Sequence, residues 1–141
     1  DPASRAGAGG GPGGAAPRLA LPGAPAAASD ADIRAVIGAQ MEALRAGDLE
    51  AAFAHASPAI RNLFATPERF GLMVGQGYPM VRDNAATRFL ERRATDGRQW
   101  QRVMVTDLAG RVHFLDYEMI ETEAGWRING VRILEAPGAG V

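Results

Sequence analysis

The 141-residue sequence contains no cysteine and no lysine. The absence of cysteine excludes disulfide bonds, thiolate chemistry and zinc sites that are ligated by cysteine. All 15 basic residues are Arg; the codon usage of a GC-rich genome is the favoured explanation, and a selected role in binding phosphate or carboxylate is the alternative. No apolar run approaches the ~20 residues that a membrane-spanning helix requires, so we expect no transmembrane segment.

The charge balance and the histidine count limit the classes of partner. The formal net charge is −1, so the composition imposes no basic face and we expect no nucleic acid partner. Two His residues without clustered Asp or Glu at ligand spacing argue against a built-in metal site. The glycine run at residues 9–11 follows no strand and is therefore no phosphate-binding loop, and we expect no cofactor.

The composition divides the chain into three segments. Residues 1–29 contain 22 Gly, Ala or Pro residues and cannot bury enough apolar surface to become ordered, so we expect a flexible tether. Residues 30–135 carry the large apolar side chains and form one domain, and residues 136–141 are expected to be a disordered tail. Because the sequence begins at Asp1 rather than Met, a removed signal peptide is one explanation, and we expect a periplasmic or otherwise exported protein.

A first helix is predicted by apolar residues that recur at helical spacing. Ser29 or Asp30 is expected to cap its start and Gly47 to end it, and Asp48 then caps the next helix. The apolar stripe consists of Ile33, Val36, Ile37, Met41 and Leu44.

Two further helix starts come from a capping residue followed by proline. This pattern occurs at Ser57-Pro58 and again at Thr66-Pro67. Gly77–Val81 is expected to be extended, because Pro79 disfavours helical geometry in the residue before it. Together these signals predict three to four helices ahead of the strands.

The second half of the domain has the alternation of an antiparallel sheet. Residues 103–134 alternate apolar and polar positions and are broken by turns that end in Gly110 and Gly125, which predicts a three-stranded meander. Asp96-Gly97 is a two-residue hairpin signal that adds a strand before it. A bulge is expected at Asn129-Gly130. The fold class is therefore α+β, with the N-terminal helices packed on a four-stranded antiparallel sheet.

The hairpin turn fixes a register and hence the residues on each face. It pairs Phe89 with Met104, Glu91 with Arg102 and Arg93 with Trp100. We expect this side of the sheet to face the helices. Beyond the turn at Asp107–Gly110, the same side is expected to continue along the next strand with His113, Leu115, Tyr117 and Met119. The opposite side is then expected to hold Val103, Val105, Phe114 and Ile120, which are costly to leave in water, so we expect a homodimer or a protein partner through that face. On the same side, Asp116 and Glu118 are expected to form surface ion pairs with Arg88 and Arg92.

The chain resembles the nuclear transport factor two-like superfamily, and within it an uncharacterised bacterial domain-of-unknown-function family. The resemblance covers residues 30–135 and rests on the segments ALRAGDLEAAFAHAS, SPAIRNLFATPERF, GYPMV, HFLDYEMI and WRINGVRIL. It implies that the helices close one face of a curved antiparallel sheet into a cone-shaped pocket. It implies no activity, because the superfamily spans dehydratases, isomerases, transport adaptors and association modules.

Five polar or amphipathic side chains are candidates to line such a pocket: Tyr78, Trp100, Arg102, His113 and Tyr117. Either they bind a ligand there, or they are core and rim residues whose polar tips reach water or a neighbouring group. We expect a non-catalytic domain that binds a small apolar or amphipathic ligand or a protein partner.

Two other hypotheses stay open. A dehydratase or isomerase would use His113 or His55 as a base and Tyr117 as a hydrogen-bond donor. A purely structural subunit of a larger complex, membrane-associated or not, would use the apolar second face of the sheet.

Overall fold

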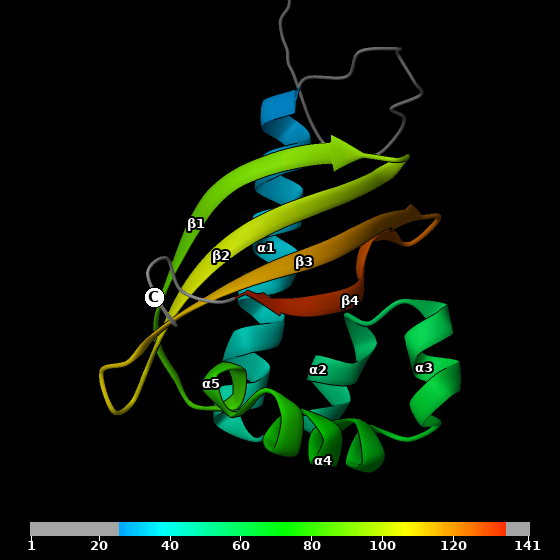
Figure 1. Cartoon of the computed structure of the whole chain (residues 1–141). Coiled ribbons are helices and arrows are strands. Elements are labelled where there is room, and N and C mark those ends of the chain that lie inside the picture. Colours follow the sequence, from blue (N-terminus) through cyan, green and yellow to red (C-terminus); the bar gives the residue numbers. More distant parts are fainter. Residues whose placement is uncertain (1–25, 135–141) are drawn as a thin grey trace, which may run out of the picture. The chain divides into compact units, whose positions relative to one another are not determined.

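The computed structural model describes residues 26–134, which form five helices followed by four strands (Figure 1). The helices are α1 (Ala26–Ala46), α2 (Leu49–Ala54), α3 (Pro58–Phe64), α4 (Pro67–Gly77) and α5 (Pro79–Arg82). The strands are β1 (Asn84–Thr95), β2 (Arg98–Asp107), β3 (Val112–Thr122) and β4 (Gly125–Leu134). The α+β class is confirmed. Residues 1–25 of the predicted tether and the predicted tail 136–141 lie outside the described residues.

The chain divides into two units, Asp1–Ala31 and Asp32–Val141. The first unit contributes only the start of α1 to the described residues. The second unit holds the rest of α1, the other helices and the whole sheet.

Helix α1 begins earlier than predicted. It starts at Ala26, so Ser29 and Asp30 lie within the helix and do not cap it. The physical reason is the alanine run at residues 26–28, because alanine is the strongest helix former. Gly47, at φ 78°, ends the helix as predicted. The predicted apolar stripe is buried at Ile33, Ile37, Met41 and Leu44.

Each of the next three helices begins at a predicted capping side chain. The side-chain oxygen accepts a backbone N–H three residues further on: Asp48 from Ala51 at 3.2 Å, Ser57 from Ile60 at 3.2 Å and Thr66 from Arg69 at 3.1 Å. These bonds satisfy donors that the first turn of a helix otherwise leaves without partners. The predicted starts of α2, α3 and α4 are therefore confirmed.

The segment Gly77–Val81 was predicted to be extended, and this prediction is wrong. Tyr78 alone leaves helical geometry, at φ −135° and ψ 54°, which is the effect expected for a residue before proline. Pro79 then occupies the first position of α5, where its missing N–H costs nothing. The chain therefore turns at Tyr78 between two helices.

The four strands lie in the order β1-β2-β3-β4, and every neighbouring pair is antiparallel (Figure 1). The hairpin at Asp96-Gly97 is confirmed, since both residues have positive φ (55° and 76°) as a tight two-residue turn requires. Arg93 pairs with Trp100 as predicted, but a bulge between Phe89 and Arg92 shifts the pairs from Ala86 to Phe89 by one residue.

The predicted helix-facing row of β3 is confirmed at Leu115, Tyr117 and Met119, which are buried in the core. The predicted face of β2 is wrong. The backbone N–H of Asp107 donates to the carbonyl of Arg111 at 2.9 Å, so the loop holds three residues and ends at Gly110, with φ 86°. This loop places Val103 opposite Leu115 and Met104 opposite Phe114. Directly paired residues share a face. Val103 and Val105 therefore face the helices beside Leu115 and Tyr117, and Trp100, Arg102 and Met104 lie on the outer face, the side turned away from the helices.

This correction removes the predicted partner surface. Val103 and Val105 have no exposed area and belong to the hydrophobic core, so they cannot contact a partner. Phe114 and Ile120 are half-buried, and Phe114 shares the outer face with the charged pair Arg102 and Asp116. The outer face is consequently more polar than the sequence pattern indicated.

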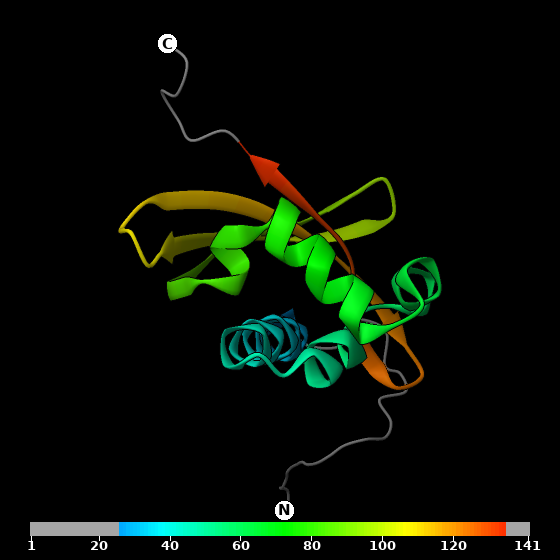
Figure 2. The same ribbon diagram turned by 90° about the horizontal axis from the view of Figure 1, so that it is seen from below.

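Helices α2, α3, α4 and α5 gather on one side of the curved sheet (Figures 1 and 2). The predicted bulge in β4 is confirmed, because Glu118 pairs with Gly130 and Met119 with Ile128, which leaves Asn129 as the extra residue. The link between α2 and α3 pairs with β4 through a parallel bridge from Ala56 to Ile128. These features place β3, β4 and the short helices around a common space.

Candidate functional site

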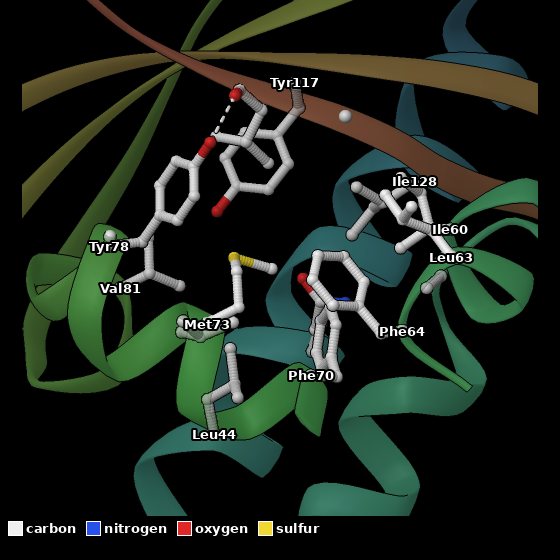
Figure 3. Close-up of a pocket in the computed structure, with 16 residues that line it drawn as sticks. Leu44, Ile60, Leu63, Phe64, Phe70, Met73, Tyr78, Val81, Tyr117 and Ile128 are labelled. Carbon is white, nitrogen blue, oxygen red and sulfur yellow. Dashed lines mark hydrogen bonds between the residues drawn. The ribbon is translucent and has the colours of Figure 1, made fainter. Parts of the chain in front are cut away.

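A cavity of about 380 Å³ lies between the short helices and strands β3 and β4. Its walls are mainly apolar (Figure 3). They include Ile60, Phe64, Phe70, Met73, Ile128 and Val131. Leu63 also lines the cavity although 70% of its surface is exposed, so the cavity opens to solvent at α3.

Helix α4 supplies much of the wall because its apolar residues recur at helical spacing. Phe70, Met73 and Val74 are three and four positions apart and lie on one face of the helix. The ring of Phe64 meets Phe70 edge-on, with centroids 6.1 Å apart, an arrangement that aromatic pairs prefer. The Thr66 cap sets the start of α4 and therefore the direction in which these side chains point.

Two polar side chains on the wall have backbone partners. The amide nitrogen of Gln40 donates to the carbonyl of Ala52 at 3.0 Å. The hydroxyl of Tyr78 donates to the carbonyl of Val131 at 2.8 Å (Figure 3). Both bonds tie a helical segment to its neighbour and keep these polar groups satisfied.

Tyr117 is the exception. Its side chain is fully buried, and its hydroxyl has no hydrogen-bond partner among the described residues. Burial, and to a smaller extent the nearby Tyr78, raise the pKa of Tyr117 well above its usual range. The phenol is therefore neutral and retains an unused proton.

The structure brings together two of the five predicted site residues. Tyr78 and Tyr117 both line the cavity. Trp100 and Arg102 lie on the outer face, so the expectation that they point into the same space is wrong. His113 lies beside the β2–β3 turn, with Nε2 2.8 Å from Oδ2 of Asp107. That hydrogen bond, followed by one from the backbone of Arg111, lowers the pKa of Asp107.

Neither histidine lines the cavity. His55 follows α2, and burial and then the neighbouring charge of Arg127 lower its pKa. The described residues of the cavity wall include no Asp, Glu, His, Lys or Arg. The tyrosine hydroxyls are therefore the only ionisable groups along the described wall.

Comparison with known families identifies the family to which the chain belongs. A family model described as a domain of unknown function (DUF4864) matches residues 26–141. The chain belongs to this family. Neither the curated proteins nor the solved structures gave a match.

The expectation of an uncharacterised domain family is confirmed for this DUF4864 domain, and membership of the nuclear transport factor two-like superfamily stays a prediction. None of the described helices is long and apolar enough to cross a membrane. Export also stays a prediction.

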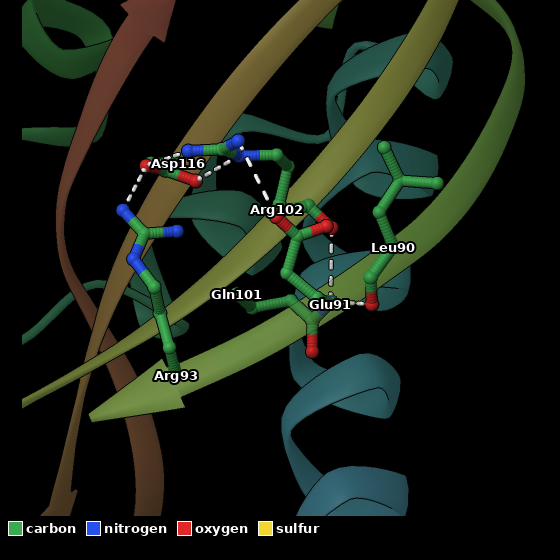
Figure 4. A network of polar contacts seen from close by, with 6 residues as sticks. All are labelled: Leu90, Glu91, Arg93, Gln101, Arg102 and Asp116. Atoms are coloured by element: carbon green, nitrogen blue, oxygen red, sulfur yellow. Dashed lines mark hydrogen bonds and ion pairs between the residues drawn. The ribbon is translucent and has the colours of Figure 1, made fainter.

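The outer face of the DUF4864 domain carries a second polar arrangement (Figure 4). The buried carboxylate of Asp116 accepts hydrogen bonds from Arg102 at 3.0 and 3.1 Å and from Arg93 at 2.8 Å. Burial acts to raise the pKa of Asp116, but the hydrogen bonds from Arg102 and Arg93 outweigh it, so the pKa is lowered. Arg102 also pairs with Glu91 at 3.3 Å. The carboxylates of Asp116 and Glu91 are both already paired with Arg side chains. We therefore assign this cluster to stabilising the sheet.

The sequence interpretation missed most of the cavity wall. Ile60 and Met73 were not among the predicted wall residues, although the helical spacing of Phe70 and Met73 is visible in the sequence. Gln40 and Val131 gave no signal, because their place on the wall depends on how distant elements meet. Only a three-dimensional arrangement could identify them.

Proposed function

We propose that this DUF4864 domain binds a small, largely apolar molecule in the cavity beneath its sheet. The single observation that carries the proposal is the cavity of about 380 Å³. Small-molecule sites commonly measure roughly 300–1,000 Å³ and are lined by apolar and aromatic side chains. A solvent-connected recess of this size with mainly apolar walls therefore favours a binding role.

A binding role is favoured over catalysis because of the groups that the wall lacks. General acid–base catalysis needs a group whose pKa lies near the working pH. The described wall offers tyrosine hydroxyls, and burial raises the pKa of Tyr117 further from neutrality. The dehydratase or isomerase hypothesis finds no base among the described residues of the cavity wall, since His55 and His113 lie elsewhere.

We also infer that the domain is a member of the nuclear transport factor two-like superfamily. Three features support this: the helices precede the strands, the four strands form one antiparallel meander, and a cavity lies between the two layers. These features concern the fold and leave the ligand to be identified by its chemistry.

Naphthalene is a suitable probe, because it is apolar, uncharged and small enough for the cavity. We expect naphthalene to bind the full chain saturably. Adding the protein stepwise to naphthalene and recording the naphthalene fluorescence measures this binding. Met73→Trp, which adds volume inside the cavity, is expected to weaken binding at least tenfold. Absence of saturable binding up to the solubility limit of naphthalene would overturn the proposal.

The matched control lies at the next position of the same helix. Leu72 is 65% exposed and does not line the cavity, so Leu72→Trp is expected to bind naphthalene like the wild type. Val131→Phe on β4 is a second occluding variant, used if circular dichroism finds Met73→Trp unfolded. Equal affinity in the occluding and control variants would place naphthalene outside the cavity and contradict the proposal.

A further inference from the structure

We propose that Tyr117 determines the specificity of the cavity, by pairing its hydroxyl with a single uncharged polar group, such as an alcohol, phenol or carbonyl, on an otherwise apolar ligand. This inference rests on the proposed binding function and adds the chemical class of the ligand.

The first step of the argument is the state of the hydroxyl. A buried polar group without a hydrogen bond is costly and rare in native structures. The Tyr117 side chain is fully buried and its hydroxyl has no partner among the described residues. A phenylalanine at this position would supply the same ring to the core without that cost. The hydroxyl therefore needs a partner that the described residues do not contain.

The second step is the direction of the side chain. The ring of Tyr117 extends from β3 into the cavity, and its hydroxyl points toward Met73 on α4 (Figure 3). Tyr78 lies beside it, but the hydroxyl of Tyr78 is turned to the carbonyl of Val131. The unused hydroxyl thus lies at the cavity wall behind the Met73 side chain, a flexible residue that must shift for a ligand to reach it.

The third step is the number of polar groups that the ligand needs. Gln40 and Tyr78 each donate to a backbone carbonyl, which leaves Tyr117 as the wall side chain whose hydrogen-bonding group is wholly unused. One complementary group on the ligand satisfies it. The rest of the molecule contacts apolar side chains such as Phe70, Met73 and Ile128.

The fourth step is the charge of the ligand. The described wall carries no cationic side chain, so a carboxylate would lose its hydration without gaining an opposite charge. A neutral hydroxyl or carbonyl loses much less and regains a hydrogen bond from Tyr117. The cavity is therefore expected to reject anions of the same shape.

Three naphthalene compounds test these steps in the full chain: naphthalene, 2-naphthol and 2-naphthoate, which differ only in the polar group. By calorimetric titration we expect 2-naphthol to bind the wild type about fivefold more tightly than naphthalene, as one neutral hydrogen bond allows. We expect 2-naphthoate to bind more weakly than naphthalene. In Tyr117→Phe, which keeps the ring and removes the hydroxyl, the preference for 2-naphthol over naphthalene should be lost.

The outcomes separate this inference from the proposed function. If naphthalene does not bind the wild type, the binding function itself fails. If naphthalene binds but Tyr117→Phe keeps the preference for 2-naphthol, or if 2-naphthoate binds as well as 2-naphthol, the role of Tyr117 is overturned. The thermal melting of unliganded Tyr117→Phe gives an independent readout. We expect a melting temperature at least as high as that of the wild type, and a lower one would reveal an internal partner and contradict the inference.

Discussion

The hydroxyl of Ser57 donates a hydrogen bond of 2.7 Å to Oδ1 of Asn129, which joins two positions 72 residues apart in the sequence. Ser57 is the cap of α3, and Asn129 is the extra residue in the β4 bulge. The backbone N–H of Ser57 also donates to Ile128 at 2.8 Å. These bonds connect the start of α3 to the bulge of β4. We call this connection between Ser57 and residues 128–129 the joint between the helices and the sheet.

Loss of this joint should cost more than loss of an ordinary helix cap. Ser57→Ala removes a buried hydroxyl that serves both Ile60 and Asn129, and we expect it to lower the free energy of unfolding by about 2 kcal/mol. Thr66→Ala removes the corresponding but exposed cap of α4 and should cost about 1 kcal/mol or less. Urea denaturation of both variants measures the difference, and equal losses would contradict a joint role for Ser57.

The corrected faces of β2 predict opposite responses at neighbouring positions. Val103→Asn places an amide in the core, where Val103 has no exposed area, and should cost about 3 kcal/mol or more. Met104→Asn alters a half-buried outer-face position and should cost about 1 kcal/mol. Thermal or urea unfolding distinguishes the two, and a larger loss at Met104 would restore the original face assignment.

Asp116 should be the most consequential carboxylate on the outer face. Asp116→Ala leaves Arg93 and Arg102 without their shared anion, and we expect a loss of about 2–3 kcal/mol in the free energy of unfolding. The loss should fall short of that for a wholly buried ion pair, because the two Arg side chains are 38% and 29% exposed. Asp83→Ala, which breaks an exposed pair with Arg82, is the control and should leave stability unchanged within error.

The same carboxylate should make stability depend on acid pH. The pKa of Asp116 is lower in the folded protein than in the unfolded chain, where it lies at about 3.9. The unfolded chain therefore binds a proton more readily, and the stabilisation from Asp116 is present above about pH 4 and is lost as the pH falls through the folded pKa. The stability difference between wild type and Asp116→Asn should be constant from pH 7 to 5 and shrink below pH 4, whereas a gap that widens in acid would contradict this assignment.

The parts of the fold that depend on short-range chemistry could be predicted from sequence. Ser57 and Thr66 cap helices because their oxygens reach a backbone N–H three residues away, and Asp96-Gly97 turns because both residues adopt positive φ. The bulge at Asn129 was likewise predicted from a short motif, Asn129-Gly130. The caps and the hairpin turn require no knowledge of a distant element.

The faces of β2 could not be predicted, because they depend on whether the loop between β2 and β3 holds three residues or four. A turn that ends in Gly110 accommodates either a three- or a four-residue connection, and the choice exchanges the two faces of the sheet. Hydrophobicity did not decide between them, since Val103 and Val105 on one face and Trp100 and Met104 on the other are all apolar. Tyr78 and Tyr117 were placed in the cavity, whereas Trp100 and Arg102 were misplaced with their strand.

The bridge between Ala56 and Ile128 also affects how this chain meets other chains. β4 is an edge strand, and unpaired backbone groups on an edge can add a strand from a second molecule and start aggregation. At Ile128 both backbone groups are occupied, since its N–H donates to His55 and its carbonyl accepts from Ser57. The link between α2 and α3 thus blocks edge-to-edge growth at the point where the bulge already bends the strand.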